Sequence, residues 1–165
     1  MKLKQKPSVD QSLRLKSVRT SGELVDKNAV EYQKLQDHFL AMTLMQPKLR
    51  SLLKAEQAEL FSGDSQTIFQ FLIKHPDFVG DPKTAKELKS VADYVKIIAL
   101  QFETLYQDLE FDDLQQSATR LKDRLVRSYI KDQKQHLMIT MQHTSDDGEL
   151  KKLIDQVDKL NQRIK

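Results

Sequence analysis

The feature that most constrains the fold of this chain is the stretch from Asp112 to Ser145, which contains neither glycine nor proline. Because those two residues are the strongest helix breakers, the stretch predicts one helix of about 30 residues, about 45 Å long. Its apolar positions change register midway, so the first half is expected to face a folded body and the second half another neighbour. The early positions are Leu114, Ala118, Leu121 and Leu125, and the later ones are Val126, Ile130, Leu137 and Met141.

A turn over residues 144–148 separates this helix from a final one, with Ser145, Asp146 or Asp147 as the expected cap. The final helix has the clearest amphipathic pattern in the chain, and we expect it to pack antiparallel against the long helix as a hairpin. The expected pairs are Met141 with Leu150, Leu137 with Ile154, Ile130 with Leu160 or Asn161, and Val126 with Ile164.

Residues 28–111 predict a compact bundle of five helices that is rich in Leu, Ile and Phe. The first is capped by Asp26 or Asn28 and ends before Pro47, which opens the second. The third carries Phe69 and Phe71, which are expected in the core together with Phe102. The fourth is a short helix from Pro82 to about Leu88, and the fifth is capped by Ser90 and includes Leu100 and Leu105. With the hairpin of residues 112–165, the predicted fold class is all-α.

Residues 1–27 lack a sustained helical period and are interpreted as a flexible leader or linker. Residues 1–28 carry 7 basic and 3 acidic side chains, whereas the whole chain has a net charge of only +3. No segment is a dense basic stripe, so strong nucleic-acid binding is not expected. Binding of single-stranded DNA through residues 2–19 remains an alternative.

Signals for catalysis, cofactors and metals are weak. The chain has no cysteine and no glycine-rich phosphate loop, and we predict no enzyme activity, cofactor or small-molecule substrate. The acidic pairs Asp112-Asp113 and Asp146-Asp147 are interpreted as helix caps. His136 and His143 share a helix face without a third ligand, so no metal site is predicted. No apolar run reaches the roughly 20 residues needed to span a bilayer, and a secretory signal is not apparent.

The hairpin supplies the candidate binding site. Tyr129, Met138 and Ile139 fall off its main seam and either form a partner surface or pack on the bundle or leader; the sequence favours neither reading. A helix-in-groove contact would also use the apolar stripe of the two helices. The partner-binding candidates are Tyr129, Leu137, Met138, Ile139, Met141, Leu150, Leu153, Ile154, Val157, Leu160 and Ile164.

The order of these features resembles the C-terminal helicase-interaction domain of bacterial DnaG-type primases, over about residues 28–165. The resemblance rests on the helix pair His38–Leu53, on the loop and aromatic helix Phe61–Ile73, and on the long helix and hairpin ending at Leu160–Lys165. That domain is similar in fold to the N-terminal domain of the DnaB-type replicative helicase. A closing helix at the C-terminus favours the primase over the helicase, whose related domain runs on into an ATPase.

The resemblance implies a non-catalytic domain that binds the N-terminal ring of the DnaB-type helicase in the cytoplasm. Such a domain couples primer synthesis to unwinding within the primosome, and the primase catalytic core and zinc-binding domain would lie upstream. Two alternatives remain: a helical adaptor that self-associates, and the N-terminal domain of the helicase itself. Complex formation with a replicative helicase hexamer is the observation that separates them.

Overall fold

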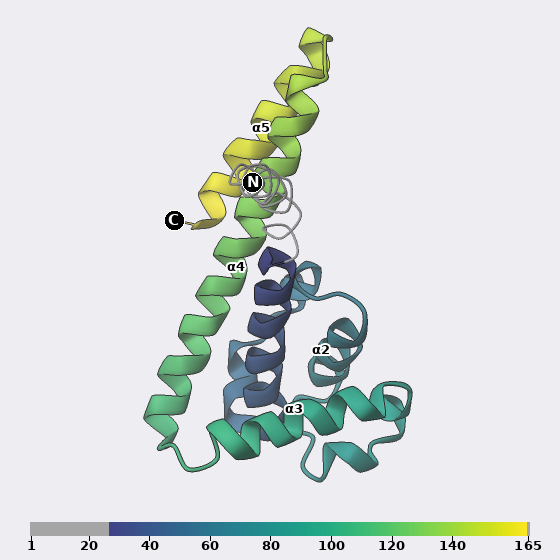
Figure 1. The fold of residues 1–165 in the computed structure, drawn as a ribbon, viewed down its shortest axis with the longest axis vertical. Coiled ribbons are helices and arrows are strands. Elements are labelled where there is room, and N and C mark those ends of the chain that lie inside the picture. The colour runs from purple at the N-terminus through teal and green to yellow at the C-terminus, as the bar shows by residue number, and fades with distance from the viewer. Residues whose placement is uncertain (1–26, 165) are drawn as a thin grey trace, which may run out of the picture. The chain divides into compact units, whose positions relative to one another are not determined.

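The computed structural model describes residues 27–164, which consist of helices and connecting loops without a strand (Figure 1). The predicted all-α class is confirmed. The predicted leader, apart from Lys27, and the alternative DNA-binding stretch of residues 2–19 lie outside the described residues. Within residues 27–164, no helix combines the length and the apolar character needed to cross a bilayer.

Contacts between residues divide the chain into two units, Met1–Lys34 and Leu35–Lys165. Of the first unit, the structure describes residues 27–34, which open a helix that runs from residue 27 to residue 45. The contacts reported below all lie in the second unit. Its further elements are η1 (Pro47–Leu52), η2 (Ala55–Leu60), α2 (Asp64–Lys74), η3 (Pro82–Thr84), η4 (Lys86–Val91), α3 (Ala92–Leu105), α4 (Phe111–Gln142) and α5 (Asp147–Ile164).

An apolar core joins the first helix to α2, α3 and η4. The ring of Phe61 stacks between those of Phe39 and Phe69, with centroid distances of 6.3 and 4.7 Å. The predicted core positions Phe69, Phe71 and Phe102 are all buried, as expected. Other buried side chains are Leu40, Met42, Leu44, Leu49, Ile68, Leu72, Leu88, Val95 and Ile98.

The second predicted helix is wrong in form, because two 3-10 helices, η1 and η2, take its place. The backbone is extended at Leu53 and Lys54 between them. The side chain of Arg50 turns back to donate hydrogen bonds to the carbonyls of Thr43 and Leu44, at the end of the first helix. This long-range contact overrides the local helical pattern, since secondary-structure propensity is only a weak preference.

The expected short helix at Pro82 is two 3-10 helices, η3 and η4, separated at Ala85. Ser90 was expected to cap the next helix, but it lies inside η4, and the N-cap of α3 is Val91 without a side-chain hydrogen bond. The apolar residues Leu100 and Leu105 are exposed, because the buried face of α3 consists of Val95, Ile98 and Phe102.

The long helix and the hairpin form as predicted. α4 has 32 residues, buries Leu114, Ala118 and Leu125 in its first half, and contacts η1 and η2. α5 lies beside the second half of α4 (Figure 1). The carboxylate of Asp146 accepts a hydrogen bond from the amide of Glu149 and caps α5, which selects one of the three expected caps.

Candidate docking surface on the helical hairpin

About half of the predicted partner-binding residues pack in the seam between α4 and α5. Leu153 is buried, and the other seam residues are half-buried: Leu137, Met141, Leu150, Val157 and Leu160. The sequence paired Leu137 with Ile154, whereas the structure buries the preceding residue, Leu153, and leaves Ile154 exposed. These six side chains pack between the two helices, so they offer a partner little surface.

Four of the predicted residues remain exposed. The exposed fractions are 59% for Met138, 49% for Ile139, 43% for Ile154 and 44% for Ile164. These side chains lie on a polar hairpin, at positions that the packing of its two helices does not bury. Exposed apolar groups on a small helical element are a common feature of binding surfaces.

Tyr129 packs against the bundle, which is the second of the two alternatives that the sequence left open for it. Its hydroxyl donates a hydrogen bond to the carboxylate of Glu59 in η2, at 3.3 Å. The same carboxylate pairs with the guanidinium of Arg163 from α5, and that guanidinium lies 5.9 Å from the centre of the Tyr129 ring. Burial, followed by the charge of Glu59, raises the pKa of Tyr129, so the phenol stays neutral and serves as the donor.

We call Glu59, Tyr129 and Arg163 the latch, because these three residues join η2, α4 and α5. The Glu59–Arg163 pair is about 40% exposed on each side, so water and salt weaken it. The latch therefore holds the last turn of α5 modestly and does not determine the fold.

Replacing Glu59 with glutamine should loosen that last turn. We expect hydrogen exchange at the amides of residues 161–164 to accelerate about two- to fivefold, because a half-exposed pair contributes about 0.5–1 kcal/mol. Asp93→Asn is the matched control, since it removes the exposed Asp93–Lys96 pair on α3. Unchanged exchange at residues 161–164 would show that the latch does not restrain α5.

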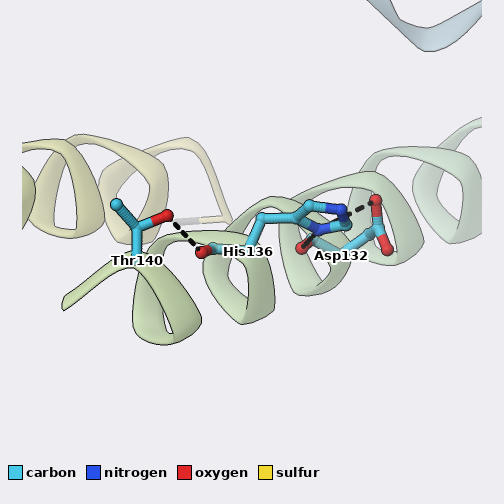
Figure 2. A network of polar contacts seen from close by, with 3 residues as sticks. All are labelled: Asp132, His136 and Thr140. Carbon is cyan, nitrogen blue, oxygen red and sulfur yellow. Dashed lines mark hydrogen bonds and ion pairs between the residues drawn. The ribbon is translucent and has the colours of Figure 1, made fainter. Parts of the chain in front are cut away.

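The histidines of the hairpin are engaged within α4 or exposed. Nδ1 of His136 lies 2.9 Å from the carbonyl oxygen of Asp132 and 3.7 Å from its carboxylate, and Thr140 donates to the carbonyl of His136 (Figure 2). These contacts are one helical turn apart and are local to the helix. Among residues 27–164, no group of three potential metal ligands is present.

The histidines of the bundle are part of polar clusters at the edge of the core. Nδ1 of His38 lies 2.6 Å from the hydroxyl of Tyr106, and burial raises the pKa of that phenol. His75 lies 2.8 Å from the carboxylate of Glu87.

A further polar contact joins α3 to the first helix. The hydroxyl of Tyr94 lies 2.5 Å from the carboxylate of Asp37, and burial and this carboxylate raise the pKa of Tyr94. Its phenol therefore stays neutral and fastens α3 to the first helix.

Two surface features were not predicted from the sequence. A groove of about 300 Å³ runs along α4 to the end of α5. Its lining includes three cations, which we call the rim, Arg127, Lys131 and Lys134, and three apolar side chains, which we call the floor, Ile130, Met138 and Ile164. The spacing of the rim cations, four and three residues, was a readable signal, but only the packing of α5 shows that an apolar floor lies beside them. The second feature is a set of three exposed apolar side chains on α3, Ile97, Leu100 and Leu105, which we call the exposed strip of α3.

Comparison with protein-family models, with curated proteins and with solved structures found no match to this chain. The candidate surface therefore depends on the geometry of the hairpin itself.

Proposed function

We propose that this chain is a non-catalytic interaction domain that docks through its helical hairpin on the N-terminal ring of a DnaB-type replicative helicase. The observation that carries the proposal is the set of exposed apolar side chains on the hairpin, namely Met138, Ile139, Ile154 and Ile164. The order of helices that resembles the primase C-terminal domain supplies the identity of the partner. The role would be to couple primer synthesis to unwinding in the cytoplasm.

The hairpin suits such a role physically. α4 continues without a break from the bundle, where Leu114, Ala118 and Leu125 anchor it, into the hairpin. A partner that binds the hairpin is therefore connected to the bundle through α4 and through the latch. The seam and the latch keep the two helices together, so their exposed side chains are presented by a preformed surface. Preformed surfaces lose less conformational entropy on binding.

Substituting Ile154 with aspartate should weaken binding to a helicase hexamer by at least about tenfold, because a charge then faces the apolar contact. Isothermal titration calorimetry with the hexamer measures this effect. The side chain is already exposed, so the helical content and melting transition should be preserved. The matched control is Leu100→Asp, which makes the same change at an exposed apolar position of α3.

The control also tests the second candidate function, self-association. The exposed strip of α3, with Ile97, Leu100 and Leu105, favours this alternative because it is apolar and separate from the hairpin. If the chain sediments as a dimer, Leu100→Asp disrupts it, and the helicase does not bind, the chain is a self-associating adaptor. If the chain alone forms a ring, it is instead a helicase N-terminal domain. Equal binding of the helicase by wild type and Ile154→Asp would refute docking through the hairpin.

A further inference from the structure

The groove along the hairpin combines an apolar floor with a cationic rim. Ile130 is fully buried at its base, and the exposed side chains of Met138 and Ile164 continue the apolar lining. Arg127, Lys131 and Lys134 lie on the same side of α4, because positions i, i+4 and i+7 share one helix face. The lining of the groove is therefore apolar in one part and positively charged in another.

Within residues 27–164, none of Arg127, Lys131 and Lys134 forms an ion pair with a carboxylate. Residues 124–142 of α4 contain four basic side chains and one acidic side chain, Asp132. This excess positive charge beside an apolar lining remains available for a ligand of opposite charge.

We infer that the groove binds an acidic amphipathic helix of the partner, with apolar side chains on the floor and carboxylates against the rim. This inference rests on the proposed use of the hairpin as a docking surface and defines the chemistry of the partner there. An α-helix matches the rim, because carboxylates spaced four and three residues apart also share one face. Laid along α4, they would meet Arg127, Lys131 and Lys134 in sequence.

Two other occupants fit the groove less well. A second copy that used the same surface would face its own rim cations across a twofold axis, which places like charges together. A nucleic acid would match the cations, but the groove lining contains no aromatic side chain on which a base could stack. Its apolar floor would then be covered by a charged backbone, which is unfavourable.

The test uses the full chain and a fluorescein-labelled synthetic helix of about 18 residues, with leucines on one face and glutamates beside them. Fluorescence anisotropy measures binding. A second peptide has glutamine at each glutamate position. We expect the glutamine peptide to bind about tenfold more weakly than the acidic peptide. Raising the salt concentration from about 0.05 to 0.5 M should substantially weaken the binding of the acidic peptide only.

Charge reversal of the rim provides the second arm. The double variant Arg127→Glu/Lys131→Glu should bind the acidic peptide about tenfold more weakly than wild type. Lys151→Glu/Lys152→Glu is the matched control, because it makes the same change in net charge at two exposed lysines of α5 outside the groove. The control should stay within about twofold of wild type. Met138→Gln, which alters only the floor, should also weaken binding of the acidic peptide.

Several results would overturn the inference. These are equal binding of the glutamine peptide, equal losses in the two double variants, or displacement of the peptide by a single-stranded oligonucleotide. Binding of the helicase hexamer distinguishes this inference from the proposed function. A chain that binds the hexamer but not the acidic peptide refutes only the groove chemistry. A chain that binds the peptide but not the hexamer refutes the helicase role and supports the groove as an acidic-helix site.

Discussion

Replacing Arg50 with methionine should lower the free energy of unfolding by about 3 kcal/mol, which corresponds to roughly 10 °C in melting temperature. Arg50 is only 6% exposed, and its guanidinium donates to four carbonyl oxygens. These belong to Thr43 and Leu44 at the end of the first helix, and to Pro76 and Phe78 in the loop after α2. Methionine has a similar length but no donor, so these carbonyls would lose their partner.

The cost is large because the acceptors are polar groups next to the core. An unpaired buried carbonyl costs about 1–3 kcal/mol, and part of that cost is offset because methionine avoids burying a charge. Burial lowers the pKa of Arg50, and the nearby carboxylate of Asp77 opposes this shift. The side chain nevertheless stays charged, because the ordinary pKa of arginine lies far above neutral pH.

Urea denaturation followed by circular dichroism measures the effect. Arg124→Met is the matched control, because Arg124 is exposed on α4 and should change stability by less than about 0.5 kcal/mol. Arg50→Lys should fall between wild type and Arg50→Met, since an ammonium keeps the charge but lacks the planar fork. Equal stability of Arg50→Met and Arg124→Met would show that the four hydrogen bonds are dispensable.

The second large effect is expected at Ile98 on α3. Ile98→Ala should destabilise the chain by about 2–4 kcal/mol, because removing apolar groups from a packed core loses transfer free energy and leaves a cavity. Ile98 has no solvent exposure, while its neighbour Ile97 is 62% exposed. The pair offers the same substitution in the same helix at adjacent positions.

Ile97→Ala should therefore change the free energy of unfolding by less than about 0.5 kcal/mol. Alanine even has the higher helix propensity, which favours a small gain. Thermal melts of the two variants, monitored at the same protein concentration, measure the difference. Equal destabilisation would mean that the exposed strip of α3 is covered, for instance by a second copy of the chain.

Hydrophobic periodicity was sufficient to predict the four longest elements that follow the first helix. α2, α3, α4 and α5 begin and end within a few residues of their expected bounds. Of the two acidic pairs expected as helix caps, only the one at Asp146 caps its helix, whereas Asp112 and Asp113 lie in the first turn of α4, whose N-cap is Glu110 without a side-chain hydrogen bond. These elements are predictable because breakers, caps and apolar spacing act within one or two turns of the chain.

Exposure was harder to predict than helicity. The sequence placed Leu100 and Leu105 among the apolar residues of the fifth helix without deciding their burial, and it paired Ile154 with Leu137 in the hairpin. The structure leaves all three exposed. Two neighbouring apolar residues, such as Leu153 and Ile154, are similar in type and lie close together in the hydrophobic pattern. The pattern therefore does not show which of the two is buried. Burial depends on which neighbour packs there, and the helix itself does not contain that information.

By itself, the sequence of this protein determined an all-α chain with a long uninterrupted helix and a terminal hairpin, because helix formation and amphipathicity follow from local residue order. Tertiary packing was needed to show that Arg50 bridges the first helix and the loop after α2, that Glu59 joins Tyr129 and Arg163, and that Ile164 of α5 lies beside the basic positions of α4. Each of these features joins residues far apart in the chain. Such contacts arise when packing brings separate helices together, and no local pattern encodes them.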